Sequence, residues 1–298
     1  MKVHKLFIYL LIAASFFMIT ACGGGGGGDS TGSGEVAMSI TDAKPLLPDG
    51  ATNLWVTFKE VLVHKSGGGW KSLPLPETPY TIDLLQFYDG ETTELVPPVL
   101  LEYGKYTQIR LVIDEEEGAW IRFDNDDTKK YPVEIPPEHL KTDKNFTFDP
   151  IDQSAVDIII DFDLSRSLVV TDDGSGTLSY KLKPVLHIVY ASEAATINGK
   201  IAQGSFVDGK NARVTVLLYN PDPASPGGGE YEEYTKVEVS ESGTDPTGFS
   251  IYWLVPNRDY RVEIDLDPDS DGFDYDEDID ANDLEPGEVW YLNSDIPI

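Results

Sequence analysis

The chain has 298 residues, of which 22 are basic and 52 acidic, and its formal net charge is −30 at pH 7. This charge argues against nucleic acid as a partner and against docking on anionic lipid through the protein's own charge, because both need basic patches. Apolar residues make up 41% and aromatic residues 11%, which predicts a globular body. A single cysteine excludes an internal disulfide, so the fold depends on its hydrophobic core.

The first residues have the layout of an export signal. A short basic segment, Met1–Lys5, precedes the apolar run Leu6–Met18, and small residues follow. The apolar run is too short for a hydrocarbon core, which needs about 20 helical residues. We therefore expect residues 1–21 to be a cleaved secretory signal.

The junction Ile19–Cys22 resembles the bacterial lipobox, in which the signal is cut before a cysteine whose thiol carries a diacylglycerol. The resemblance makes Cys22 the predicted lipidation site and the membrane a partner through the lipid anchor. The alternative is an ordinary cleaved signal with a cysteine at this place by chance. Removing residues 1–21 leaves 20 basic and 52 acidic residues, a net charge of −32.

Residues 22–34, rich in glycine and serine, form a predicted flexible tether with a typical reach of about 20 Å. Lipoproteins kept at the inner membrane of Gram-negative bacteria often carry Asp after the cysteine. This chain has Gly23 there. The residue after the cysteine therefore favours a protein that is lipid-anchored in the cell envelope at the outer membrane and not at the inner membrane.

We expect the body to be all-β, with two β-sandwich domains in tandem at residues 35–191 and 195–298. The chain's 27 glycines and 20 prolines separate short runs rich in Val, Ile, Thr, Tyr and Phe. In the first domain the predicted strands are Glu35–Thr41, Asn53–Lys65, Thr107–Ile113, Trp120–Phe123, Tyr131–Ile135, Val156–Leu164, Thr177–Leu182 and Val185–Tyr190. In the second they are Thr196–Ile201, Ala212–Tyr219, Tyr234–Val239, Phe249–Leu254, Tyr260–Leu266 and Val289–Leu292.

The run Val156–Leu164 shows the clearest alternation. Its even-numbered residues are apolar, whereas Asp157, Asp161 and Asp163 share the other face. This pattern predicts a strand with one face on a core and the acids on the solvent side. Short helical turns are expected near Asp83–Phe87 and Pro137–Lys141.

The first domain resembles a family of bacterial lipoprotein domains described only as a domain of unknown function. The segments that carry the resemblance appear in order: Ser39–Ala43, Val56–Trp70, Ile82–Leu85, Tyr103–Ile113, Asp161–Asp163 and Tyr180–Val189. The resemblance implies an exported β domain on a lipid tether and brings no catalytic residues with it.

The second domain is similar to transthyretin-like or carboxypeptidase-regulatory β-sandwiches. The resemblance rests on Gly199–Ile201, Ala212–Val214 and Thr244–Ile264, and it departs from the usual Pro-Gly-x-Tyr at Pro256–Tyr260. Such modules usually act as spacers or binding units.

Residues 267–278 have the ligand spacing of an EF-hand-type calcium loop. The predicted ligands occupy loop positions 1, 3, 5, 7 and 12, and Gly272 provides the turn at position 6: Asp267, Asp269, Asp271, the Phe273 carbonyl and Asp278. Asp278 is shorter than the usual Glu, which points to weak binding. The alternative is a solvated acidic turn, although residues 265–280 hold nine acids and no base.

No catalytic constellation is evident, so we expect a non-catalytic binding, adhesion or scaffold module, stabilised by calcium, with an unknown envelope protein or glycan as partner. The alternative is an envelope hydrolase that cleaves polysaccharide through paired carboxylates such as Asp161 and Asp163. Trp70 and Trp120 could belong to a sugar-binding surface, but core packing or a turn cap accounts for them more simply.

Overall fold

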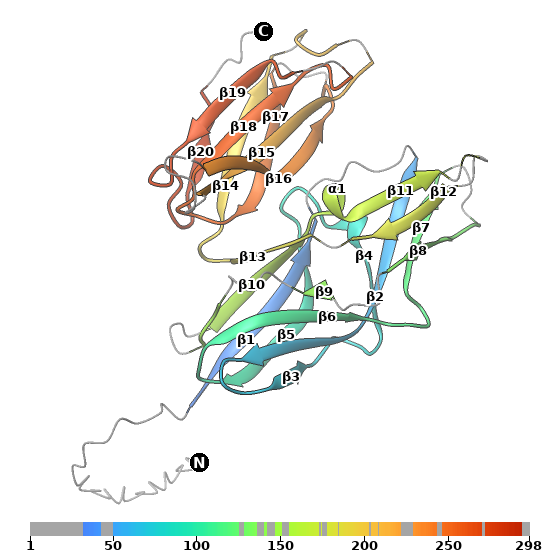
Figure 1. Cartoon of the computed structure of the whole chain (residues 1–298), viewed down its shortest axis with the longest axis vertical. Coiled ribbons are helices and arrows are strands. Elements are labelled where there is room, and N and C mark those ends of the chain that lie inside the picture. Colours follow the sequence, from blue (N-terminus) through green and yellow to red (C-terminus); the bar gives the residue numbers. More distant parts are fainter. Residues whose placement is uncertain are drawn as a thin grey trace, which may run out of the picture. The chain divides into compact units, whose positions relative to one another are not determined.

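The computed structural model describes residues 32–42, 50–124, 128–135, 140–141, 147–150, 155–172, 174, 178–183, 185–202, 204–207, 209–221, 229–242, 246–269 and 272–293. Residues from Gly32 onward form one compact unit. Nearly all of its regular structure is β-strand (Figure 1), which confirms the predicted all-β class. Within the described part, no helix is long and apolar enough to cross a membrane.

The N-terminal strands form two sheets. The smaller has the order β13-β10-β1-β5, and its strands are β1 Ser33–Thr41, β5 Thr93–Glu102, β10 Ala155–Phe162 and β13 Leu186–Tyr190. The larger has the order β11-β12-β8-β7-β2-β6-β9, with β3 and β4 also paired to β2. Its strands are β2 Ala51–Lys65, β3 Trp70–Leu73, β4 Tyr80–Asp83, β6 Tyr106–Ile113, β7 Ala119–Phe123, β8 Tyr131–Glu134, β9 Leu140–Lys141, β11 Leu168–Asp172 and β12 Leu178–Leu182.

The C-terminal strands also form two sheets. One has the order β17-β14-β20 and consists of β14 Ala195–Ile201, β17 Thr247–Leu254 and β20 Val289–Tyr291. The other has the order β16-β15-β18-β19 and consists of β15 Ala212–Pro221, β16 Gly229–Val239, β18 Tyr260–Asp265 and β19 Tyr275–Ile279. Among the described residues, the helical elements are the short η1, Leu84–Gln86, and α1, Leu164–Ser167.

Buried apolar side chains form two clusters. One runs from Val36 to Ile188 and the other from Ala195 to Leu292. Each cluster takes alternate residues from facing sheets, as the period of a half-buried strand requires. Because a single compact unit contains both clusters, the division into two independent domains stays a prediction.

Several strands that the pattern did not predict, among them β5 and β19, lie at sheet edges. β5 contains Pro97 and Pro98, which argue against a strand in a sheet interior but are tolerated at an edge. β19 lies within the acidic run, where the many charged residues leave no alternating apolar pattern that would predict a strand. It forms the outer edge beside β18, and charged edges are common because they discourage pairing with other chains.

The end of β10 corrects a prediction. The alternate apolar residues Val156, Ile158, Ile160 and Phe162 are buried as expected, but Asp161 and Asp163 are buried too. Asp163 ends the strand, because its side chain accepts a hydrogen bond from Arg166 N and so caps α1. Leu164 therefore belongs to α1 and not to the strand.

Candidate functional site

The predicted lipidation site, Cys22, lies outside the described residues, as does Asp271 of the predicted calcium loop. Neither position is tested by the structure. The remaining residues of the acidic loop, the paired carboxylates and the tryptophans are described, and their surroundings decide what each can do.

The first acids of the predicted calcium loop bind a lysine. Lys210 Nζ forms ion pairs with Asp267 and, at 3.0 Å, with Asp269 Oδ2. The hydrogen bond from Lys210 holds the pKa of Asp267 below its ordinary value. An ammonium group thus supplies positive charge where the sequence predicts a metal ion.

The last predicted ligand lies in a strand. Asp278 is the cross-strand partner of Arg261 in the β18–β19 ladder, and the guanidinium donates to both of its oxygens, at 2.6 and 3.1 Å. Within the described part of the chain, no group of three acidic, histidine or cysteine side chains is placed to hold a metal ion. Since Asp271 is not described, calcium binding by this loop stays a prediction.

The paired carboxylates do not face solvent. Asp161 lines a cavity of only about 20 Å³ together with Asp42, from the segment after β1, and Asp163 is fully buried. Burial raises the pKa of Asp42 well above its ordinary value, and the nearby charges of Asp161 and Asp163 add to the effect. A polysaccharide chain cannot enter a cavity that holds about one water molecule.

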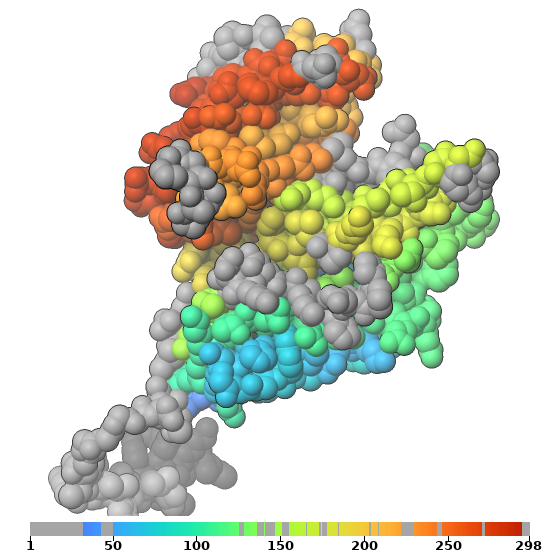
Figure 2. Space-filling view, viewed as in Figure 1, coloured from blue at the N-terminus to red at the C-terminus, as the bar shows by residue number. Residues whose placement is uncertain are grey.

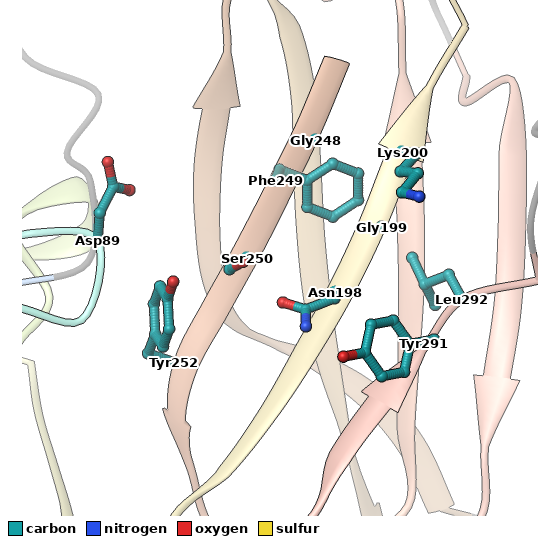
Figure 3. A pocket seen from close by; sticks show the side chains of 10 residues that line it. All are labelled: Asp89, Asn198, Gly199, Lys200, Gly248, Phe249, Ser250, Tyr252, Tyr291 and Leu292. Carbon is teal, nitrogen blue, oxygen red and sulfur yellow. The ribbon is translucent and has the colours of Figure 1, made fainter. Parts of the chain in front are cut away.

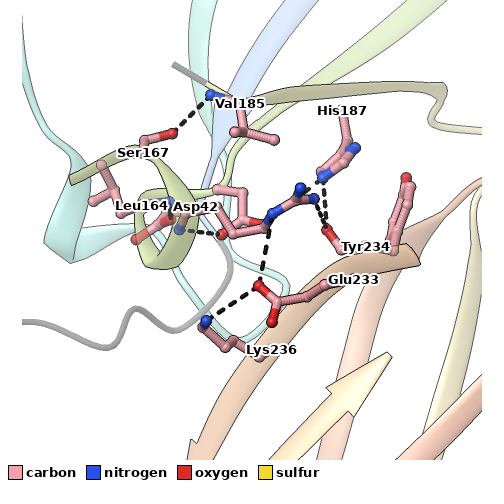
Figure 4. Close-up of polar contacts among 10 residues, drawn as sticks. Asp42, Leu164, Ser167, Val185, His187, Glu233, Tyr234 and Lys236 are labelled. Carbon is pink, nitrogen blue, oxygen red and sulfur yellow. Dashed lines mark hydrogen bonds and ion pairs between the residues drawn. The ribbon is translucent and has the colours of Figure 1, made fainter. Parts of the chain in front are cut away.

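These acids belong to a polar contact between the N-terminal and C-terminal strands (Figure 4). The carbonyl oxygen of Tyr234, on β16, accepts from Arg166 Nη1 at 3.0 Å and lies 2.9 Å from His187 Nε2. Arg166 also lies 3.7 Å from Glu233, and His187 lies 3.8 Å from Asp163. In the space-filling view the orange atoms of the C-terminal strands meet the yellow-green atoms near α1 (Figure 2).

The two tryptophans that could have formed a sugar platform are engaged otherwise. The Arg110 guanidinium lies 4.0 Å from the ring centre of Trp70, and His64 packs edge-on against the same ring at 5.1 Å. Trp120 donates its indole N–H to the Glu117 carbonyl. These contacts agree with packing and a turn cap.

A groove that the sequence did not reveal lies on the β17-β14-β20 sheet. It has a volume of about 480 Å³ and is lined by Asp89, Asn198, Gly199, Lys200, Gly248, Phe249, Ser250, Tyr252, Tyr291 and Leu292 (Figure 3). This volume falls within the roughly 300–1,000 Å³ that is typical of small-ligand sites. It is far larger than the cavity of about 20 Å³ beside Asp161.

Small residues on neighbouring strands make the groove concave. Gly248 pairs with Lys200, and Ser250 pairs with Asn198, across the β14–β17 ladder. A Cβ built at Gly248 meets no atom within 4 Å, so the space above it is open. At Gly199, by contrast, a Cβ would collide with the ring of Phe249, which packs over the glycine.

Two tyrosines stand at the sides of the groove. Tyr291 on β20 is 68% exposed and Tyr252 on β17 is 36% exposed. A bulge places Tyr252: the β14–β17 register shifts between Ala195 and Ile197, and Trp253 has a φ of 62°. Bulges of this kind redirect side chains and are frequent beside binding sites.

A polar atom of the groove lacks a partner. Asn198 Oδ1 is enclosed and accepts no hydrogen bond from any described residue. Leaving such an acceptor unpaired costs about 1–3 kcal/mol, and unpaired buried groups in native proteins usually have a reason such as a missing water or ligand. Sequence reasoning missed this site because its residues come from three strands and from the distant Asp89. The available signal was the alternate positions Gly248, Ser250 and Tyr252, which lie just before and within the predicted strand Phe249–Leu254.

Comparison with solved structures finds likenesses at low scores. The Bacillus anthracis TIE protein is 12% identical with a TM-score of 0.21; the match covers 87% of this chain, which spans a third, 33%, of that protein. The fimbrial anchor protein Mfa2 from Porphyromonas gingivalis is 11% identical with a TM-score of 0.19 and 82% of each chain covered. A putative adhesin from Bacteroides ovatus is 10% identical with a TM-score of 0.23, with 88% and 87% of the two chains covered. TM-scores this low establish no common fold.

No curated protein matches the chain. The transthyretin-like resemblance of residues 195–298 stays a prediction. Residues 33–184 match a family model, and the matched range contains five of the six segments that carried the first resemblance and the beginning of the sixth, Tyr180–Val189. Asp42, Asp161 and Asp163 lie within it. With about half of its length matched, the chain belongs to the family described as "Domain of unknown function (DUF4382)".

Proposed function

We propose that this chain is a lipid-anchored, non-catalytic binding protein of the bacterial envelope and that it holds its ligand in the groove on the β17-β14-β20 sheet. Its role is adhesion or scaffolding: the lipid on Cys22 fixes one end at a membrane, and the groove engages a second envelope component.

The observation that carries the proposal is the groove itself. A cavity of about 480 Å³, with an exposed tyrosine at each side and the unpaired acceptor of Asn198 between them, combines apolar area with a few placed polar groups. This combination is the general character of small-ligand sites.

The hydrolase alternative relied on Asp161 and Asp163. Both are buried, and the cavity beside Asp161 is too small for a substrate. The groove contains a single carboxylate, Asp89, whereas glycoside hydrolysis ordinarily needs two flanking the scissile bond. Binding is therefore the function that the geometry supports better.

The test uses the chain from Gly23, which keeps every described residue, and measures how much of it sediments with isolated cell envelopes. Gly248→Val should reduce the bound fraction at least tenfold, because the valine fills the groove. The backbone at Gly248 is extended and its Cβ position is open, so the variant should melt like the wild type.

Gly69→Val is the matched control. Gly69 lies between β2 and β3, and a Cβ there also meets no atom within 4 Å, but the position is not part of the groove. Its bound fraction should equal that of the wild type. If Gly248→Val binds envelopes as well as Gly69→Val does, the groove is not the binding site and the proposal fails.

A further inference from the structure

We propose that the ligand of the groove is an uncharged saccharide, a short segment of a neutral glycan held between Tyr252 and Tyr291. This inference rests on the proposed function and adds the chemical class of the ligand. Four features of the groove carry it: the aromatic sides, the amide between them, the charge of the lining and the shape of the floor.

The aromatic sides fit the two kinds of surface that a sugar ring presents. A pyranose has apolar C–H faces and a polar rim of hydroxyl groups. A tyrosine ring offers a broad apolar face and a polar hydroxyl, which suits partners with one apolar and one wet side. Tyr291 exposes 68% and Tyr252 36% of its surface, and Figure 3 shows both rings beside the groove.

The position of Tyr252 is built into the fold. Gly90 follows Asp89 in a turn where both residues have positive φ, 55° at Asp89 and 87° at Gly90. A Cβ at Gly90 would lie 3.1 Å from Tyr252 Cδ1, so the ring rests against a residue without a side chain. The bulge at Trp253, with its φ of 62°, is a strained backbone conformation of the kind that persists when the surrounding structure requires it. Both features hold the ring in place before a ligand arrives.

The polar groups of the groove match hydroxyl groups. An amide both accepts and donates hydrogen bonds, as a sugar hydroxyl does. Asn198 has an acceptor without a partner, and its cross-strand neighbours are Ser250 on one side and Tyr291 on the other. Hydroxyl-bearing side chains thus flank the amide, which lines the groove.

The charge of the lining selects a neutral ligand. The lining holds one acid, Asp89, and one base, Lys200, whereas the whole chain carries −30. A phosphorylated or uronic-acid ligand would meet repulsion from the rest of the molecule and only one lysine to bind it. A neutral ligand meets neither the repulsion nor a desolvation cost for its own charge.

The floor is shaped for a ring and not for a peptide strand. Outward positions of β17 alternate between the small residues Gly248 and Ser250 and the large Tyr252. The depression therefore lies over the middle of the sheet between β14 and β17, whose backbone groups are already paired with each other. Strand addition would need a free sheet edge, and the free edges of this sheet are the outer sides of β17 and β20, not the face between β14 and β17.

Isothermal titration calorimetry tests the inference with maltohexaose, cellohexaose, laminarihexaose and chitohexaose, and with polygalacturonate as an anionic probe. We expect at least one neutral hexaose to bind the wild type and polygalacturonate not to bind. Tyr252→Ala and Tyr291→Ala should each weaken binding at least tenfold, whereas Tyr291→Phe, which keeps the ring face, should stay within threefold of the wild type. Gly248→Val should abolish binding and Gly69→Val should leave it unchanged.

The inference is overturned if none of the four hexaoses binds, if polygalacturonate binds more tightly than they do, or if the alanine variants bind as the wild type does. Its failure is distinct from that of the proposed function. If Gly248→Val no longer sediments with cell envelopes but no hexaose binds the wild type, the groove is the binding site and its ligand is not a neutral glycan of this panel. If Gly248→Val keeps its envelope binding, the proposed function itself is wrong.

Discussion

At the residue scale, Asp42 is the clearest case of a side chain whose environment departs from its sequence context. Its Oδ1 accepts a hydrogen bond from Leu164 N at 3.0 Å, while Oδ2 has no partner among the described residues. Burial raises its pKa well above the ordinary 3.8, because an ionised carboxylate loses its hydration there. Asp42 and Asp161 come from distant segments, and the fold alone brings them together.

The sign of this shift determines how stability depends on pH. A carboxyl with a raised pKa contributes its stabilisation fully below its ordinary pKa, and the contribution is lost as the pH rises through the raised value. Asp42→Asn keeps the acceptor for Leu164 N and carries no charge at any of these pH values. The variant therefore does not lose stability as the pH rises, as the wild type does. The variant should therefore gain in melting temperature relative to the wild type between pH 4 and pH 7.5, by roughly 2–4 °C per kcal/mol relieved.

Thermal melts at several pH values measure the difference between the two proteins. Asp157→Asn is the control for the loss of one negative charge, because Asp157 is exposed and lies on β10, the neighbour of β1. A melting-temperature difference for Asp42→Asn that is flat from pH 4 to pH 7.5 would contradict the raised pKa.

At the element scale, the β18–β19 hairpin carries the calcium prediction. Lys210 pairs with Asp267 and Asp269, so an incoming calcium ion would have to displace an ammonium group. Millimolar calcium should raise the melting temperature, because a ligand that binds only the folded state stabilises it, and Lys210→Ala should enlarge the shift by removing the competitor. Asp267→Ala combined with Asp271→Ala should abolish it.

Melting temperatures measured in calcium, in magnesium and in chelator test this prediction. Lys183→Ala, at an exposed lysine far from the hairpin in the sequence, controls for the loss of one positive charge. Equal melting temperatures in millimolar calcium and in chelator, for both the wild type and Lys210→Ala, would show that the loop is a solvated acidic turn.

The sequence predicts elements where a single physical signal dominates and misses them where two signals compete. β10 and β15 were predicted because their apolar residues alternate over a long run. β5 was missed because Pro97 and Pro98 contradict a strand unless the strand lies at an edge, and edges are set by tertiary pairing. Asp161 and Asp163 were expected on a solvated face, because one strand cannot reveal that a second group of strands, through Tyr234, covers that face.

The candidate groove was beyond sequence reasoning for the same reason. Its residues become neighbours only when β14 pairs with β17 on one side and with β20 on the other. The bulge that turns Tyr252 arises from a register shift, and a register shift depends on the partner strand as much as on the strand itself.

At the scale of the whole molecule, two separate apolar clusters are joined by a polar contact and not by a shared core. A polar interface of this kind contributes less to the association of the two groups of strands than a shared hydrophobic core would. Residues 35–191 and 195–298, expressed apart, should therefore each give a soluble, β-rich product with a cooperative melt. If neither half folds while the whole chain does, the boundary or the two-domain interpretation is wrong.

We expect the lipid predicted on Cys22 to hold the molecule at a membrane, because a net charge of −30 disfavours binding of the protein itself to an anionic membrane surface. Each buried methylene contributes about 0.8 kcal/mol, and stable anchoring takes more than one acyl chain, which a diacylglycerol on Cys22 provides. Cys22→Ser should leave the precursor uncleaved by the lipoprotein signal peptidase and without incorporated label when cells are fed a fatty-acid probe. Ala21→Gly, which keeps a small residue before the cut, should still be labelled. Undiminished labelling of Cys22→Ser would exclude Cys22 as the lipid attachment site.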